Sequence, residues 1–193
     1  MTRQDFLFSR VQSGHILDVG NLGRGGEIHK RLIAVLPHAE IHGLDIESQE
    51  KYGFDFPHQA VGSAEALPYP DGYFNTIYLG EVLEHTWLPR HVVNECYRVL
   101  KPQGVLILDT PNVYALSRML RFLAMGRDII LGNPDHKIFY SRAMMENLLE
   151  KSGFQKIEST TDSKFTIKGR DFKLPRFGPC AFLGEHLLAA AWK

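Results

Sequence analysis

The stretch from His15 to Ile28, HILDVGNLGRGGEI, constrains the fold of this chain more than any other. A short apolar run leads into four glycines within seven residues, and apolar residues at helical spacing follow. An apolar run bounded by glycines is typical of a buried strand, and glycines permit a tight turn that brings bare backbone close to a ligand. Strand, glycine turn and helix together predict a binding site at the carboxyl end of the first strand of an open α/β sheet. A plain β–α turn without a ligand is the alternative, and the number of glycines favours the site.

Strand and helix patterns alternate along the rest of the chain. Strands are predicted at 40–46, within 58–74, and at 77–79, 105–110, 154–160 and 186–192. Helices are predicted at 27–36, 89–101, 113–126 and 141–154. This order predicts a mostly parallel sheet with helices on its faces. Residues 1–14 are expected to pack outside the sheet, and 162–180 to form a polar connection between the last two strands.

Composition excludes several classes of protein. With 193 residues the chain is expected to form one domain, 1–193, with a sizeable core. Its formal net charge is zero, so the chain lacks the overall positive charge that is typical of nucleic-acid-binding proteins. No apolar run approaches the roughly 20 residues of a membrane span, and the two cysteines, Cys96 and Cys180, make no disulfide framework. We expect a cytoplasmic protein without stable membrane insertion, and the sequence predicts no oligomeric state.

Five stretches, taken in order, resemble the class I S-adenosylmethionine-dependent methyltransferases, and in particular the small-molecule branch that includes the ubiquinone-biosynthesis type. They are ILDVGNLGRG, HGLDI, GSAEALPYPDGYFNTIYLGEVLEHTWLP, ECYRVLKPQGVLILDTPN and DHKIFYSRAMMENLLEKSGF. The resemblance implies a Rossmann-like, doubly wound, mostly parallel seven-stranded sheet with an antiparallel last strand. It also implies S-adenosylmethionine as cofactor and methyl transfer to an oxygen or nitrogen atom of a small-molecule acceptor.

The resemblance further implies a set of cofactor-binding residues. The loop containing Gly20 and Gly23 would surround the methionine part, and Asp18 would shape this loop and face the cofactor amine. Asp45 follows the glycine cluster by about 20 residues, the spacing of a ribose-binding carboxylate, and would accept hydrogen bonds from both ribose hydroxyls. Ile46 would pack on the adenine ring. The set is completed by residues at the adenine or on the cofactor's other side: Ser63, Ala64, Glu65, Gly80 and Glu81.

The glycine loop departs from the family's first motif, Asp-x-Gly-x-Gly-x-Gly. Leu22 and Arg24 stand between the glycines here, so that the loop is one residue longer or shifted in register. A nicotinamide dinucleotide site needs Gly-x-Gly-x-x-Gly, which no register of 20–28 supplies. The altered loop keeps one alternative open, namely a catalytically inactive cofactor-binding or partner-binding domain of the same fold.

Two histidines are candidates for the catalytic base. An oxygen or nitrogen nucleophile must lose a proton, for which an imidazole is suited. His136 and His85 are both expected at the carboxyl edge of the sheet, and His136 is favoured because the insert 113–137 should cover the acceptor as a lid. A helix that only covers the sheet, or a lipid-contacting surface, are the alternatives for the insert. Glu81, Glu84 and His85 could hold a divalent cation, as in some ubiquinone-type methyltransferases. A turn and helix start is favoured for this segment, and no metal ligand is assigned.

Overall fold

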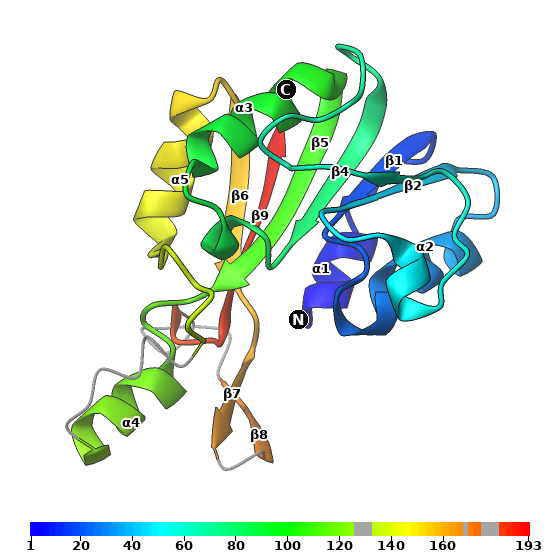
Figure 1. The fold of residues 1–193 in the computed structure, drawn as a ribbon. Coiled ribbons are helices and arrows are strands. Elements are labelled where there is room, and N and C mark those ends of the chain that lie inside the picture. The colour runs from blue at the N-terminus through cyan, green and yellow to red at the C-terminus, as the bar shows by residue number, and fades with distance from the viewer. Residues whose placement is uncertain (126–132, 168–169, 175–181) are drawn as a thin grey trace.

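A seven-stranded sheet forms the centre of the computed structural model, which describes residues 1–125, 133–167, 170–174 and 182–193 (Figure 1). The strand order is β3-β2-β1-β4-β5-β9-β6. Strand bounds are β1 His15–Val19, β2 Glu40–Asp45, β3 Gln59–Val61, β4 Phe74–Gly80, β5 Leu100–Pro111, β6 Lys156–Thr161 and β9 His186–Trp192. Only β9 runs antiparallel to its neighbours within this sheet. The predicted Rossmann-like sheet with an antiparallel last strand is therefore confirmed.

Helices cover both faces of the sheet, with α3 and α5 on one side and α1 and α2 on the other (Figure 1). The helices are α1 Arg3–Phe8, α2 Glu27–Val35, α3 Pro89–Val99, α4 Leu116–Met125 and α5 Arg142–Lys151. Pro89 begins α3, where a missing N–H costs no helical hydrogen bond. Ser141 caps α5 as predicted, because its side chain accepts a hydrogen bond from the backbone amide of Met144.

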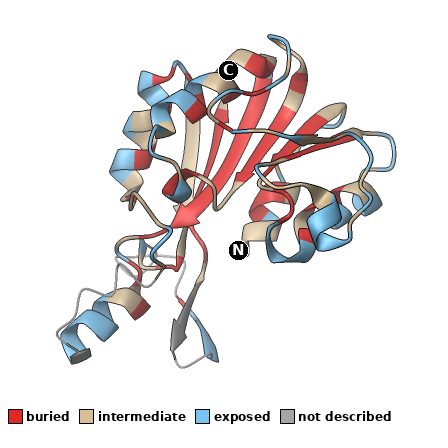
Figure 2. Ribbon diagram, in the orientation of Figure 1, coloured by how far each residue is buried: buried red, intermediate tan, exposed pale blue. Residues whose placement is uncertain are grey.

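Two apolar cores lie against the two faces of the sheet, and the central strands are buried along most of their length (Figure 2). Alternate residues of each strand enter opposite cores, so that Leu17 packs towards α3 and Ile16 towards α1. The parallel register pairs Val19 of β1 with Leu44 of β2 and Leu79 of β4. The carboxyl ends of these three strands therefore meet at one edge of the sheet.

The prediction for 162–180 was wrong in one respect, because this segment contains a β-hairpin. Strands β7, Lys164–Ile167, and β8, Arg170–Lys173, pair antiparallel, while 168–169 and 175–181, including Cys180, lie outside the described residues. Each strand has four residues, too few for the alternation of polar and apolar residues to reveal it.

The hairpin and α4 extend beyond the carboxyl end of β5, away from the sheet (Figure 1). The predicted insert 113–137 thus contains α4, and its residues 126–132 lie outside the described part. Among the described residues, no helix combines the length and the apolar character needed to cross a bilayer.

Candidate functional site

A cleft opens at the carboxyl ends of β1, β2 and β4. It consists of two adjoining cavities of about 320 Å³ each, which share part of their lining, including Gly20, Glu81 and His85. All ten residues predicted to bind the cofactor line one or both cavities: Asp18, Gly20, Gly23, Asp45, Ile46, Ser63, Ala64, Glu65, Gly80 and Glu81. The structure thus brings together side chains from four separate stretches of the sequence.

The glycine loop after β1 adopts a backbone conformation that most residues avoid. Gly20, Gly25 and Gly26 have φ between 65° and 72°, and a methyl group at Gly20 would lie 2.7 Å from Cγ2 of Val82. Arg24 also has a positive φ of 50°, so that the residue departing from the family motif stands where glycine would be favoured. Gly23 has ordinary backbone angles and open space around it, so glycine is not needed there.

Asp45 ties this loop to the end of β2. Its carboxylate accepts hydrogen bonds from the backbone amides of Leu22, at 3.2 Å to Oδ2, and of Glu47, at 3.1 Å to Oδ1. A carboxylate has about four lone-pair positions, so each oxygen keeps the capacity to accept a second donor from the cleft. Asp45 therefore has a local structural role, which the sequence did not predict.

The Asp45 side of the cleft offers open apolar surface. Ile46 and Trp87 line the same cavity, and these two residues are 75% and 72% exposed. Ser63–Glu65 form a turn beside them, in which the Glu65 amide donates to Oγ of Ser63. Exposed large apolar groups at a cavity are a typical feature of a site for a flat, partly apolar ligand.

Asp18 lies at the floor of the other cavity, beneath the glycine loop. It is almost fully buried, and its Oδ2 lies 3.1 Å from Nδ1 of the buried His29. Burial raises the pKa of Asp18, and this hydrogen bond opposes the increase. The Asp18–His29 pair anchors the start of α2 to the end of β1.

Glu81 is the centre of a charged network that the sequence did not reveal. Its Oε1 lies 3.2 Å from Nη1 of Arg3 and 3.0 Å from Nε2 of His186, and its Oε2 lies 2.5 Å from Nη2 of Arg24. The other ring nitrogen of His186 lies 2.9 Å from Oδ2 of Asp162. The Arg24–Glu81 pair joins the loops after β1 and β4 across the cleft.

The protonation states in this network follow from burial and pairing. Burial alone would raise the pKa of Glu81, but His186, Arg3 and Arg24 outweigh it and lower the pKa to about 2. Burial alone would lower the pKa of His186, but hydrogen bonds to Asp162 and Glu81 raise it to about 9. At neutral pH the Glu81 carboxylate, which lines the cleft, is therefore ionised and lies beside the charged imidazolium of His186.

Arg3 carries a second buried contact. Its Nη2 lies 2.5 Å from Oδ1 of Asp109, and Oδ2 of Asp109 accepts a hydrogen bond from the Tyr78 hydroxyl. Arg3 and Tyr78 both line the cavity that contains Asp18. Helix α1 thus places a positive charge at the end of the cleft next to the glycine loop.

A group of three titratable residues adjoins the cleft at His85 and consists of Glu84, His85 and His136. One ligand-capable atom of each lies within 4.8 Å of the others, and the rings of His85 and His136 meet edge to face at 4.8 Å between centroids. Of the three, only His85 lines the two cavities, and His136 and Glu84 lie next to it outside their lining. Glu81, considered with Glu84 and His85 as a possible metal set, is instead paired with Arg3 and His186.

This region contains titratable groups suited to proton transfer. Burial raises the pKa of Glu84 to about 7, although Thr110 donates a hydrogen bond to its Oε2. Burial lowers the pKa of His136, and His85 and Arg118 lower it further. Several buried polar atoms here have no hydrogen-bond partner among the described residues: Glu84 Oε1, His136 Nδ1, Ser117 Oγ, Arg118 Nε and Tyr140 Oη. Buried polar atoms without partners indicate a place for a polar ligand or for water.

Comparison with known proteins places the chain among methyltransferase-like sequences. A family model described as "Methyltransferase domain" matches residues 17–108. A probable S-adenosylmethionine-dependent methyltransferase of Mycolicibacterium smegmatis is 37% identical over 99 residues, which is 51% of this chain and 35% of that protein. A ubiquinone biosynthesis O-methyltransferase of Colwellia psychrerythraea is 24% identical over 156 residues, 75% of this chain and 63% of that protein. The chain thus spans less than two thirds of either relative.

The fold has a match among solved structures. An S-adenosylmethionine-dependent methyltransferase from Archaeoglobus fulgidus superposes with a TM-score of 0.71 at 17% identity. The match covers 100% of this chain and 95% of that one.

Proposed function

We propose that this chain, which belongs to the class I S-adenosylmethionine-dependent methyltransferases, transfers the methyl group of S-adenosylmethionine to an oxygen or nitrogen atom of a small-molecule acceptor. The main support is the convergence, in one cleft, of all ten residues that the family resemblance implied. The neutral net charge gives no reason to expect a nucleic-acid partner, and on composition alone we place the activity in the cytoplasm.

The residues of the cleft fit the parts of the cofactor in order. The Asp45 carboxylate would accept ribose hydroxyls, and Ile46 and Trp87 would pack against the adenine ring. The methionine part carries both a carboxylate and an ammonium group, and the opposite end of the cleft holds Arg3 and Glu81 close together. This pairing of charges favours a zwitterion at that end.

Proton removal from the acceptor would fall to His136. When bound, S-adenosylmethionine supplies a methyl group on a positively charged sulfur, and its loss leaves a neutral thioether. The lowered pKa of His136 keeps the imidazole neutral at pH 7 and able to accept a proton, and its buried Nδ1 has no partner among the described residues. Glu84, when ionised, would stabilise the imidazolium formed, and His85 is the alternative base.

The acceptor would bind over Glu84, His85 and His136, next to α4 of the insert. Arg118 of α4 contributes a buried guanidinium nitrogen to this end, which supports the insert as a cover for the acceptor. The chain's own contribution to rate is to hold the acceptor in line with the methyl group and to exclude water. A domain that binds the cofactor or a partner without turnover is the second candidate. It is favoured by the ion pair between Arg24 and Glu81, which spans the cleft in which the cofactor would bind.

Incubation of the protein with S-adenosylmethionine labelled in its methyl group and with a fractionated metabolite extract tests the proposal. We expect label in at least one small molecule, and slower labelling with Asp45→Ala but not with His91→Ala, which removes an exposed imidazole of α3. Binding of the cofactor without any transfer would favour the inactive alternative. Failure to bind the cofactor would overturn the proposal.

A further inference from the structure

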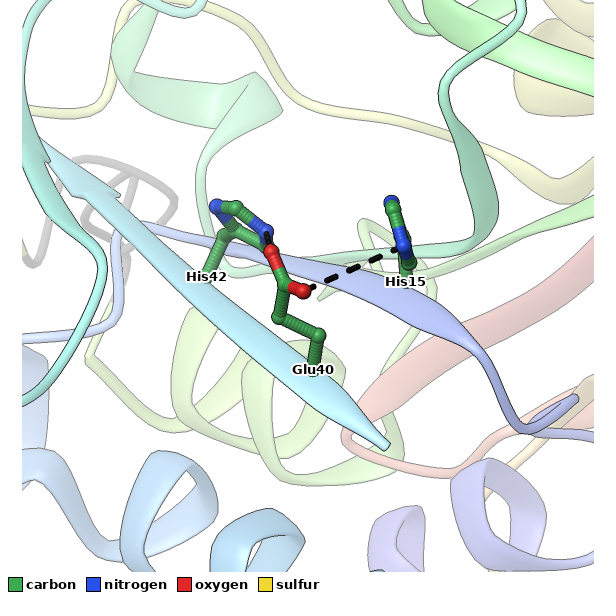
Figure 3. A group of neighbouring side chains, drawn as sticks. All are labelled: His15, Glu40 and His42. Atoms are coloured by element: carbon green, nitrogen blue, oxygen red, sulfur yellow. Dashed lines mark hydrogen bonds and ion pairs between the residues drawn. The ribbon is translucent and has the colours of Figure 1, made fainter. Parts of the chain in front are cut away.

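We propose that His15, Glu40 and His42 form a binding site for one zinc ion at the amino-terminal ends of β1 and β2 (Figure 3). This edge of the sheet lies opposite the cleft. His15 begins β1 and Val19 ends it at the cleft, about 13 Å away at about 3.3 Å per residue. The site is therefore independent of the proposed methyl transfer.

The sheet register brings the three side chains onto one face. His15 pairs with Glu40 across the parallel strands β1 and β2, so their side chains project to the same side. His42 follows Glu40 by two residues and shares that side, because strand side chains alternate. The backbone thus places two imidazoles and one carboxylate as neighbours before any side chain is oriented.

The observed side-chain positions are close to those of a metal site. Figure 3 shows the Glu40 carboxylate between the two imidazole rings. Nε2 of His42 lies 2.7 Å from Oε1 of Glu40, and Nε2 of His15 lies 3.9 Å from Oε2. One ligand-capable atom of each residue lies within 4.8 Å of the others. The side chains of His15 and Glu40 are 34% and 39% exposed, which gives them room to close around an ion.

The ligand chemistry favours zinc over hard cations. Two imidazoles and one carboxylate, at about 2.0–2.2 Å from the metal, form a set that zinc uses when a further position stays open. Mg²⁺ and Ca²⁺ prefer sites made of oxygen atoms. His58 can supply the fourth ligand, because its ring centroid lies 4.9 Å from that of His42 and its side chain is exposed.

A zinc ligand must offer a free lone pair on an imidazole nitrogen or a carboxylate oxygen. Nδ1 of His15 is buried and has no partner among the described residues, which leaves a ring nitrogen available.

Aromatic rings hold the two imidazoles in place. The Tyr73 ring lies 4.5 Å from that of His15, edge to face, and 5.6 Å from that of His42. Its hydroxyl also donates to Oε1 of Glu40 at 3.4 Å. Neighbours that orient the ligands are a regular part of metal sites. The alternative is a plain hydrogen bond between Glu40 and His42, with no metal ion bound and with His15 and His58 only nearby.

Calorimetric titration of the tag-free, metal-free protein with ZnCl₂ tests this proposal. We expect one equivalent of zinc to bind the wild type with micromolar or lower Kd and to raise its Tm. His42→Ala and Glu40→Gln should each weaken binding by at least about tenfold, since even outer residues of metal sites contribute that much. His15→Ala serves as a second ligand variant, and His91→Ala, which removes an exposed imidazole on α3, should leave the affinity unchanged.

A second group, Glu84, His85 and His136, makes the test specific. The double variant His85→Ala/His136→Ala should bind zinc at the first site as the wild type does. The proposal is overturned if the wild type binds no zinc, or if binding is lost in this double variant and persists in His42→Ala. Circular dichroism and affinity for S-adenosylhomocysteine, expected to be unchanged in all ligand variants, show that each variant is folded.

Discussion

Asp45→Ala separates the loop role that the structure shows for this residue from the ribose-binding role that we propose. In the absence of ligand, the variant loses two hydrogen bonds to backbone amides, those of Leu22 and Glu47. At about 0.5–1.5 kcal/mol each, this loss is expected to lower the free energy of unfolding by about 1–3 kcal/mol. For a chain of this length each kcal/mol corresponds to a decrease of about 2–4 °C in Tm.

The effect on binding is expected to be larger than a destabilised loop alone would give. A hydrogen bond between a ribose hydroxyl and an ionised carboxylate contributes about 1.5–3 kcal/mol, so affinity for S-adenosylhomocysteine should fall about ten- to a hundredfold. Asp55→Ala is the matched control, because Asp55 is exposed in the connection that follows β2 and lines neither cavity. Calorimetry well below the Tm of both variants gives the affinities, and thermal unfolding without ligand gives the stabilities.

A cycle with a modified ligand isolates the ribose contact. S-adenosylhomocysteine and its 2′-deoxy analogue are titrated into wild type and into Asp45→Ala. If the hydroxyl donates to Asp45, the wild type should prefer the hydroxylated ligand by about tenfold. The variant should lose this preference, because it cannot make the hydrogen bond with either ligand. Equal preference in both proteins would refute the ribose role and leave Asp45 with its loop role alone.

Four further outcomes are expected. His136→Ala should leave the affinity for S-adenosylhomocysteine unchanged and slow turnover on the true acceptor by ~10²–10⁴, and a variant with unaltered kcat would remove His136 from the chemistry. The free energy of unfolding should fall as pH rises from about 6.5 towards 9, because the folded-state pKa of His186 is raised to about 9 and its stabilising contribution is complete only below its unfolded pKa. Denaturant titrations across this pH range should find that the free energy of unfolding depends less steeply on pH in His186→Gln. Gly20→Ala should cost about 1–3 kcal/mol of stability, because a methyl group there meets Val82 at 2.7 Å and φ is positive, and a neutral result in urea unfolding would contradict this. Arg24→Gly should leave stability equal or higher, because relief of a left-handed conformation, about 1–2 kcal/mol, outweighs an ion pair of at most about 1 kcal/mol in which the Arg24 side chain is 65% exposed. A clear decrease in Tm would show that the contact with the largely buried Glu81 matters more.

The residues predicted from the sequence share one property, which is that they stand at the ends of strands. The ends of parallel strands meet at one edge, so Asp18, Asp45 and Gly80 could be placed together without knowledge of the strand order. Ile46 and Ser63 follow from the same principle, because each comes soon after such an end. Local pattern therefore placed the glycine loop and Asp45 at this edge, and the family resemblance supplied the other predicted residues of the cleft lining.

The charged network was beyond reach of local pattern. Arg3, Glu81 and His186 come from α1, the end of β4 and the start of β9, and Glu81 and His186 are 105 positions apart. Long charged side chains are mostly exposed, so their burial depends on partners that only the folded chain supplies. Even Asp45, which has no evident packing role in the sequence, proves to hold two backbone amides.

Calorimetric titration of the wild-type chain with S-adenosylhomocysteine, alongside NAD⁺, tests the central claim most directly. A cleft built from Asp45, Ile46 and the glycine loop should bind the demethylated cofactor in a one-to-one complex with Kd in the micromolar range or below. The loop lacks the dinucleotide pattern of glycines, so NAD⁺ should bind far more weakly. Micromolar binding of NAD⁺ together with no heat from S-adenosylhomocysteine would contradict the account.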